Sequence, residues 1–322
     1  MKKLLREDFD AGPISINEIE PGLWLGNLTA ALDVRLIEKY SITHILTVDS
    51  CPLPSNILML PSVTTKFFQI SDLPYEDLIS HLDETYDFIS QGLEKGNVLI
   101  HCYFGMSRSA AVVTAFLMRK HSINCEKALE RLKQQRSVVG PNIGFYNQLR
   151  LYEAMNFKID KSNLQFRLFR LRVAANQVSK VKIVPQSCLD IIKPDPALLT
   201  VRPNPRVYRC KNCRRIVAAA NDLLPHTKNE KLSWKDNKWS ADYSGLDLCS
   251  STYFIEPLTW INSITQSESG KITCPKCKAK LGSYNWVMGS QCSCGARVSP
   301  SFYLVPSKVD YSVIVQNIQR TV

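Results

Sequence analysis

The nine residues His101-Cys102-Tyr103-Phe104-Gly105-Met106-Ser107-Arg108-Ser109 organise the first half of this chain. An apolar run at 98–100 precedes them and predicts a short buried strand, and residues 109–118 predict a buried helix. The nine residues should therefore form a loop at the C-terminal end of a strand, where open α/β sheets bind their ligands. Backbone N–H groups of such a loop, with a helix N-terminus behind them, favour an anion such as phosphate.

The side chains of this loop fit phosphate chemistry. Gly105 lets the backbone curl close to an anion, and Arg108 can contact two phosphate oxygens with its planar guanidinium. Cys102 would lie beneath the phosphate as a thiolate nucleophile, and Ser109 could donate a hydrogen bond to its sulfur. The substrate phosphate should be bound by residues of the loop itself, namely Tyr103, Phe104, Gly105, Met106, Ser107 and Arg108. The alternative, a core cysteine beside an ordinary helix start, leaves this dense pattern unexplained.

The pattern His-Cys-x-x-Gly-x-x-Arg-Ser resembles the protein tyrosine phosphatase superfamily. The resemblance implies hydrolysis of phosphate monoesters through a phosphocysteine, without a metal ion in the phosphatase site. Phe104 departs from the small residue that many dual-specificity members carry at this position, which bears on the shape of the pocket.

Strand and helix patterns alternate before and after the loop. Strands are expected near 23–26, 44–48, 67–70 and 98–100, and helices over 30–40, 78–93, 109–118, 125–135 and about 141–157. This alternation predicts an α/β fold, a mostly parallel sheet covered by helices. The run Asn142-x-Gly144-Phe145-x-x-Gln148-Leu149 also resembles dual-specificity phosphatases, so the resemblance covers about residues 14–157. We therefore expect a phosphatase domain at 1–157.

Such an enzyme needs an acid that protonates the departing oxygen. Asp72, Glu76 and Asp77 are the candidates that precede the nucleophile. Asp72 directly follows an expected strand, so its loop should open at the same sheet edge as Cys102. It also lies thirty residues before Cys102, the interval found in dual-specificity phosphatases. Asp72 is therefore the predicted acid, whereas Asp77 better fits a helix N-cap.

The overall composition indicates an intracellular protein of two domains in a reducing compartment. The chain has 322 residues, no apolar run near the ~20 residues that span a bilayer, and no apolar signal-peptide centre. Its eleven cysteines then favour thiol chemistry and metal binding over disulfides. Residues 1–150 carry a net charge of −2, and residues 151–322 carry +13. This asymmetry suggests an anionic partner such as RNA for the second half, with an ordinary solvated basic surface as the alternative.

The second half is expected to begin with a connector. Residues 158–205 predict a basic, proline-containing linker. Within it, residues 164–172 form a basic amphipathic segment that could either dock on a partner or simply end the first domain.

Paired cysteines then predict a small β-rich zinc-binding domain over 206–322. Cys274 and Cys277, together with Cys292 and Cys294, are expected to form one four-sulfur zinc site, because a hairpin at 281–288 would bring the two pairs together. Cys210 and Cys213 begin a second site, for which Cys249 and His226 are the remaining suitable ligands. Four protein ligands leave no open position for water, so both zinc ions would be structural.

The cysteine-rich segments, with Cys249 to Trp260 between the two pairs, resemble the dual-specificity phosphatase 12 family in the same order along the chain. The resemblance implies a phosphatase of the nucleus and cytoplasm that acts on phosphotyrosine and on phosphoserine or phosphothreonine in proteins. It also implies a role for the zinc domain in assembly of the large ribosomal subunit. Two hypotheses follow, an enzyme with a targeting domain and an assembly factor that acts mainly by binding.

Overall fold

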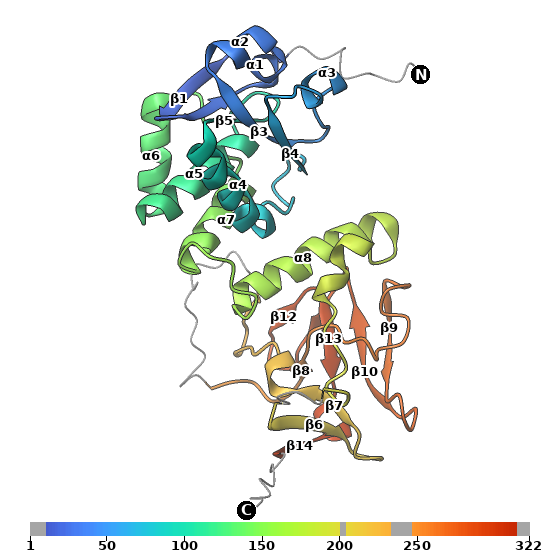
Figure 1. Ribbon diagram of the computed structural model, residues 1–322. Helices are drawn as coiled ribbons and strands as arrows, with labels where there is room; N and C mark the ends of the chain where they lie inside the picture. Colours follow the sequence, from blue (N-terminus) through green and yellow to red (C-terminus); the bar gives the residue numbers. More distant parts are fainter. Residues whose placement is uncertain (1–10, 200–203, 233–246, 314–322) are drawn as a thin grey trace, which may run out of the picture. The chain divides into compact units, whose positions relative to one another are not determined.

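The computed structural model describes residues 11–199, 204–232 and 247–313. The chain forms two compact units, Met1–Asp160 and Lys161–Val322. Figure 1 shows a sheet covered by helices in the first unit and a mainly β-stranded second unit that carries one long helix.

A five-stranded sheet forms the centre of the first unit, in the order β1-β2-β5-β3-β4. Only the β1–β2 pair is antiparallel, and the other neighbouring strands are parallel. The strands are β1 (Ile16–Glu20), β2 (Leu23–Gly26), β3 (Ile42–Asp49), β4 (Thr64–Gln69) and β5 (Asn97–His101). The expected mostly parallel sheet is confirmed.

Helices cover both faces of this sheet (Figure 1). Helix α5 packs against α4, α6 and α7 on one side, and α1 and α2 lie on the other. The helices are α1 (Leu28–Leu32), α2 (Val34–Lys39), α3 (Ser55–Leu58), α4 (Leu82–Lys95), α5 (Arg108–His121), α6 (Cys125–Gln135) and α7 (Ile143–Ala154). The single helix expected at 30–40 is divided at Asp33, because its carboxylate accepts a hydrogen bond from Leu36 N (3.1 Å) and begins a new helix there.

The register of the parallel strands brings distant residues to one sheet edge. Strand β5 lies between β2 and β3, and its apolar residues 98–100 are fully buried. His101 pairs with Thr47 of β3, and Asp49 of β3 pairs with Gln69 of β4. The carboxyl ends of β3, β4 and β5 therefore meet at the same edge, where the loop after β5 leads into α5.

The described residues of the second unit form three small antiparallel sheets and one long helix. The sheets have the orders β8-β13-β10-β9, β11-β12 and β14-β6-β7. Large buried aromatic side chains, among them Trp286, Phe254 and Phe302, form its core. The strands are β6 (Arg206–Cys210), β7 (Ile216–Ala219), β8 (Tyr253–Phe254), β9 (Ser269–Thr273), β10 (Lys280–Asn285), β11 (Ser290–Gln291), β12 (Arg297–Val298), β13 (Ser301–Leu304) and β14 (Val309–Val313).

The prediction of a linker at 158–205 is wrong for most of this range, because these residues form helices of the second unit. Helix α8 (Leu164–Val181) belongs to the second unit, and a 3₁₀ helix, Gln186–Ile191, packs against it. Phe166, Phe169 and Val178 bury one face of α8. The basic residues that suggested a partner surface instead form internal contacts, since Arg167 pairs with Glu256 and donates to Asn221 O (2.9 Å).

None of the helices in the described ranges combines the length and the apolar content that crossing a bilayer requires.

Candidate active site and metal clusters

The loop between β5 and α5 holds a buried thiol that accepts a hydrogen bond. Cys102 is 1% exposed, and Ser109 Oγ lies 3.0 Å from its Sγ as the donor. Ser109 is in the first turn of α5, so the sulfur faces the N-terminus of that helix. The predicted contact between Ser109 and Cys102 is therefore present.

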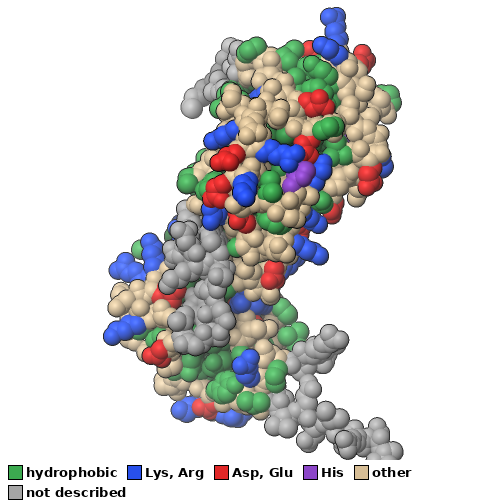
Figure 2. All heavy atoms as spheres, turned by 90° about the vertical axis from the view of Figure 1, so that its left-hand side faces the viewer, with side chains coloured by type: hydrophobic (Ala, Val, Ile, Leu, Met, Phe, Trp, Pro, Cys, Tyr) green, Lys and Arg blue, Asp and Glu red, His purple; other side chains and the backbone are tan. Residues whose placement is uncertain are grey.

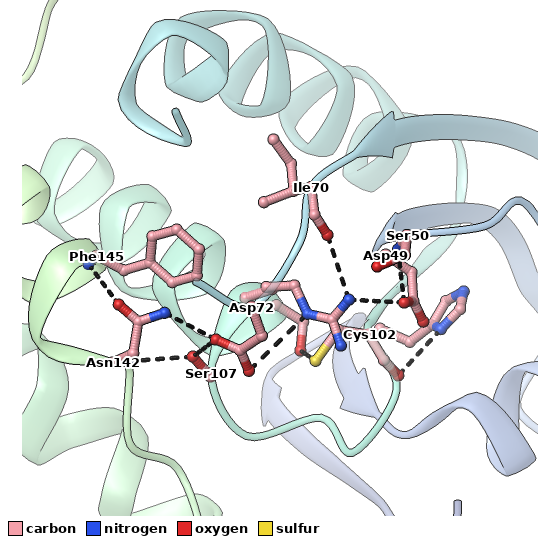
Figure 3. Close-up of polar contacts among 11 residues, drawn as sticks. Asp49, Ser50, Ile70, Asp72, Cys102, Ser107, Asn142 and Phe145 are labelled. Carbon is pink, nitrogen blue, oxygen red and sulfur yellow. Dashed lines mark hydrogen bonds and ion pairs between the residues drawn. The ribbon is translucent and has the colours of Figure 1, made fainter. Parts of the chain in front are cut away.

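Arg108 is fixed from the ends of two other strands (Figure 3). Its Nη1 donates to Asp49 Oδ1 (2.6 Å) and to Ile70 O (3.2 Å), at the carboxyl ends of β3 and β4. Its Nε is buried and has no hydrogen-bond partner among the described residues. This arrangement fixes the guanidinium plane and leaves Nε available for a substrate oxygen.

Asp72 lies at the same sheet edge, as its position after a strand predicted. Its Oδ1 accepts hydrogen bonds from Ser107 Oγ (2.7 Å) and Asn142 Nδ2 (2.8 Å). Its Oδ2 makes only a long ion pair, 4.0 Å from Arg108 Nε. Figure 3 shows the Asp72 carboxylate beside Asn142 and Ser107. Oδ2 is therefore the oxygen that could carry a proton towards a substrate.

The other two acid candidates are placed differently. Asp77 Oδ1 accepts a hydrogen bond from Ser80 N (3.1 Å), as expected of a residue that caps a helix. Glu76 uses its backbone carbonyl to accept from Gln148 Nε2 (2.8 Å).

The remaining residues of the loop form its walls. Phe104 and Met106 are exposed, by 54% and 42%, so their side chains can contact the organic part of a substrate. Tyr103 packs edge to face on Phe104, with ring centroids 4.8 Å apart. Gly105 has φ +68, and a Cβ there would lie 2.4 Å from Gly26 O, which explains the need for glycine. His101 is fully buried and its Nε2 lies 2.8 Å from Thr47 Oγ1.

Two clusters of potential metal ligands lie in the second unit. One consists of Cys210, Cys213, Cys274 and Cys277, and the other of His226, Cys249, Cys292 and Cys294. In each cluster the ligand atoms all lie within 4.8 Å of one another. Sulfur pairs are 3.5 Å apart at Cys213–Cys274, 3.6 Å at Cys210–Cys277 and 3.7 Å at Cys249–Cys292. Tetrahedral coordination with Zn–S bonds of ~2.3 Å gives S···S distances of about 3.8 Å, so the clusters fit zinc.

All eight predicted ligands are present in these clusters, but their predicted pairing is wrong. The sequence predicts that a hairpin at 281–288 brings Cys274 and Cys277 to Cys292 and Cys294. In the structure, residues 280–285 form β10, which pairs with β9 and β13 inside a larger sheet. The strand carries the chain away from the first cysteine pair. One cluster therefore combines two distant segments, and the other combines three.

His226 is more buried than its polar surroundings in the sequence suggested. It is 1% exposed and packs edge to face on Phe254, with ring centroids 5.2 Å apart. Its Nε2 is buried without a hydrogen-bond partner among the described residues. A buried imidazole with an unpaired nitrogen, close to three sulfur atoms, suits a metal ligand.

Comparison with known proteins covers both units. The family model of the dual specificity phosphatase catalytic domain matches residues 23–155. The Drosophila melanogaster dual specificity protein phosphatase MPK-4 is 40% identical over 99% of this chain and 93% of its own length. The mouse dual specificity protein phosphatase 12 is 35% identical over 91% of this chain and 87% of its own length. The Saccharomyces cerevisiae tyrosine-protein phosphatase YVH1 is 30% identical over 92% of this chain and 91% of its own length.

Because these similarities extend through the metal clusters as well as the catalytic domain, they decide the family. The chain belongs to the dual-specificity phosphatase 12 family. It is therefore a protein phosphatase of the dual-specificity class, and Cys102 lies within the residues that match the catalytic-domain model.

Sequence reasoning missed two residues of this dual-specificity phosphatase site. Asp49 holds Arg108, and Asn142 holds Asp72 while its own Oδ1 caps α7 by accepting from Phe145 N (3.0 Å). The position of Asp49 at the end of a predicted strand was the one available signal, since Asp72 was identified by the same rule. Asn142 stood in a recognised family pattern, but nothing in the sequence linked it with Asp72.

Proposed function

We propose that this phosphatase hydrolyses phosphotyrosine and phosphoserine or phosphothreonine in protein substrates through a phosphocysteine intermediate. The contact that carries the proposal is the hydrogen bond from Ser109 Oγ to the buried Cys102 Sγ, beside the fixed Arg108 guanidinium. A phosphate in the loop would receive hydrogen bonds from backbone N–H groups and from Arg108, directly above the sulfur.

In the first step the Cys102 thiolate attacks phosphorus. A sulfur–phosphorus bond forms with the sulfur lone pair, and the bond from phosphorus to the leaving oxygen breaks. Asp72 transfers its proton from Oδ2 to that oxygen, which departs as a neutral hydroxyl. The hydrogen bonds from Ser107 and Asn142 hold the other oxygen of Asp72 and so orient Oδ2.

In the second step the Asp72 carboxylate accepts a proton from water. The water oxygen attacks phosphorus, the sulfur–phosphorus bond breaks, and its electron pair returns to Cys102 as a thiolate. Ser109 Oγ donates to that thiolate and so favours its departure. Inorganic phosphate and a reprotonated Asp72 are the remaining products.

A pair of phosphopeptides tests the substrate classes. Matched peptides with phosphotyrosine or phosphothreonine at one position should both be dephosphorylated by the full chain, and a Cys102→Ser chain should release phosphate from neither. Release from phosphotyrosine alone would restrict the proposal to one substrate class. Release by the Cys102→Ser chain would refute the phosphocysteine mechanism.

We propose two structural zinc ions in the second unit, one in each ligand cluster. The sulfur separations of 3.5–3.7 Å support zinc. One ion would link the end of β6 to the turn between β9 and β10, and the other would link His226 and Cys249 to the segment after β11.

A second function is supported by charge. Residues 151–322 carry a net charge of +13, which favours an RNA-containing partner. We propose binding to precursors of the large ribosomal subunit, with the protein present in nucleus and cytoplasm. In co-sedimentation with these particles, the full chain should bind at low salt and dissociate steeply as salt rises. A chain that never co-sediments would refute this function and leave the phosphatase proposal unaffected.

A further inference from the structure

The backbone of the catalytic loop is held from outside through four consecutive carbonyl groups. Leu28 N donates to Tyr103 O (3.0 Å), and Gly140 N donates to Met106 O (2.8 Å). Between them, the Arg136 side chain donates to both remaining carbonyls, from Nη2 to Phe104 O (3.3 Å) and from Nε to Gly105 O (3.0 Å). We propose that Arg136 is a positioning residue, which turns the loop's N–H groups towards the substrate phosphate.

The inference follows from the geometry of a trans peptide. The C=O of one residue and the N–H of the next point in opposite directions across a planar unit. When the carbonyls of residues 103–106 point outward, the N–H groups of residues 104–107 point inward. None of these four N–H groups donates to another described residue. Arg136 controls the two central peptides of this cradle, those between Phe104, Gly105 and Met106.

Arg136 is built into the fold as a fixed support. It directly follows α6 and is 3% exposed. Its third donor, Nη1, bonds Asn17 Oδ1 on β1 (2.8 Å), so the guanidinium is anchored on the side away from the loop. A Cβ on Gly105 would lie 2.9 Å from Arg136 Nη2, which shows how closely the loop and the guanidinium approach.

The chemistry of the guanidinium suits this task. Its N–H groups lie in one plane and can contact two adjacent carbonyls at once, whereas a lysine ammonium supplies a single point of contact. Burial lowers the pKa of Arg136 and the negative charge of Cys102 opposes that shift, so this cation and the sulfur act on each other through the loop. The positive charge lies behind the cradle and adds to the attraction of a phosphate dianion.

Two substitutions with one matched control test the role. Arg136→Met keeps most of the apolar stem and removes every donor, and Arg136→Lys keeps the charge without the planar fork. Arg131→Met is the control, because Arg131 lies on α6 just before Arg136 and pairs with Glu20 (2.9 Å), with no described contact to the loop. Each full-length protein is assayed for turnover of an aryl phosphate and for melting temperature. The concentration of inorganic phosphate that halves alkylation of Cys102 by iodoacetamide is also measured.

The Arg136→Met protein should lose about 100-fold in kcat/KM, the cost of misplacing groups by ~1 Å. The half-protecting phosphate concentration should rise at least roughly tenfold, since misdirected N–H groups bind the anion less well. The value of kcat/KM should fall by the same factor for activated and unactivated aryl phosphates, because the substitution leaves the proton donor Asp72 unchanged. The Arg131→Met control should keep wild-type phosphate protection.

The inference would be overturned if a folded Arg136→Met protein needed no more inorganic phosphate than the wild type to protect Cys102 from alkylation. If Arg136→Met does not fold, the Arg136→Lys protein provides the test. Inorganic phosphate should then protect Cys102 from alkylation less well than in the wild type. Unchanged protection in Arg136→Lys would contradict the positioning role. The inference rests on the proposed function of Cys102 as the nucleophile, but separate experiments can refute the phosphocysteine mechanism and the positioning role of Arg136. An active Cys102→Ser protein refutes the phosphocysteine mechanism, whereas an inactive one together with unaltered Arg136 variants refutes only the positioning role.

Discussion

The Arg108 guanidinium and the Asp49 carboxylate form a buried ion pair, with 2.6 Å between Nη1 and Oδ1. Their side chains are only 7% and 5% exposed, although Asp49 ends β3 and Arg108 begins α5. Such a pair fixes Arg108 before substrate arrives, so the cation needs little reorganisation when phosphate binds.

Replacing Asp49 by Asn should therefore reduce both stability and phosphate binding. Leaving the Arg108 charge without its partner should cost up to about 3 kcal/mol in unfolding free energy. Because a bound phosphate would supply the missing negative charge, inorganic phosphate should raise the melting temperature more in Asp49→Asn than in the wild type. Equal phosphate-induced shifts in the two proteins would show that Asp49 does not position Arg108.

Cys102→Ser should abolish turnover of an aryl phosphate, since a serine hydroxyl in this loop stays protonated and is a weak nucleophile. Steady-state release of inorganic phosphate is the measurement, with Ser109→Ala as a comparison that keeps the nucleophile. Ser109→Ala should retain a fast first step and slow release of the thiolate, visible as a burst of phenol in pre-steady-state kinetics. Turnover by the Cys102→Ser protein above one-hundredth of the wild-type rate would show that Cys102 is not the nucleophile.

Asp72→Asn should lower kcat by roughly 10²–10⁴-fold on a phenyl phosphate with a poor leaving group. The loss on an activated nitrophenyl phosphate should be much smaller, because that leaving group departs without a proton. Comparing the two substrates separates proton donation from damage to the site. An equal loss on both would exclude Asp72 as the acid and direct attention to Asp77.

The pairing of the metal ligands can be tested by counting bound zinc in double variants. Cys277→Ser with Cys292→Ser should lower the zinc content from two ions per chain to none, because the substitutions affect both clusters. Cys210→Ser with Cys277→Ser should leave one ion, since both residues belong to a single cluster. The sequential pairing predicted from the sequence gives the reverse result in both proteins, so atomic absorption on the purified chains distinguishes the arrangements.

Glu20 should make the phosphatase unit sensitive to acid. Its carboxylate accepts hydrogen bonds from Lys120 Nζ (2.7 Å) and lies 2.6 Å from His121 Nε2. Burial raises the pKa of Glu20, but the hydrogen bonds and charges of Lys120 and His121 outweigh it and lower the pKa below its ordinary value. A depressed carboxyl pKa gives stability that is complete above the unfolded value of ~4.3 and is lost as pH falls towards the folded value.

The measurement is the heat-inactivation midpoint after incubation at different pH values, with turnover assayed after return to neutral pH. Glu20→Gln should lower the midpoint at neutral pH, and the gap to the wild type should close in acid. Glu18, on the same strand, provides a matched Glu18→Gln control. A gap for Glu20→Gln that stays constant through the acid range would contradict the linkage.

Much of the active site could be predicted because its residues are close together in sequence. Cys102, Arg108 and Ser109 lie on one loop, so strand and helix patterns around them were enough to place the sulfur and the guanidinium together. Asp72 was predictable from a simple rule, since parallel strands end at a shared edge. Its partner Asn142 was not, because their contact crosses from a loop to the start of α7 over 70 positions of sequence.

In the second unit, the sequence identified the candidate ligands but not how they are grouped in space. Residue type and short spacing identified all eight candidate ligands, because C-x-x-C turns are local. Which pairs share a cluster depends on the direction in which β10 carries the chain, and that direction is set by its pairing with β9 and β13. The buried face of α8 likewise has a helical sequence pattern, yet only packing assigned the helix to this unit instead of to a linker.

The sequence by itself determined the loop that carries Cys102, the mostly parallel sheet and the identities of the candidate metal ligands, since each depends on neighbouring residues and local periodicity. The tertiary structure alone decided the pairing of the ligand clusters and the partners of Arg108 and Asp72. It also decided the carbonyl contacts of Arg136, which lies 31 residues from Gly105. The physical reason is that hydrogen bonds between distant segments depend on strand order and helix packing, which no short window of sequence contains.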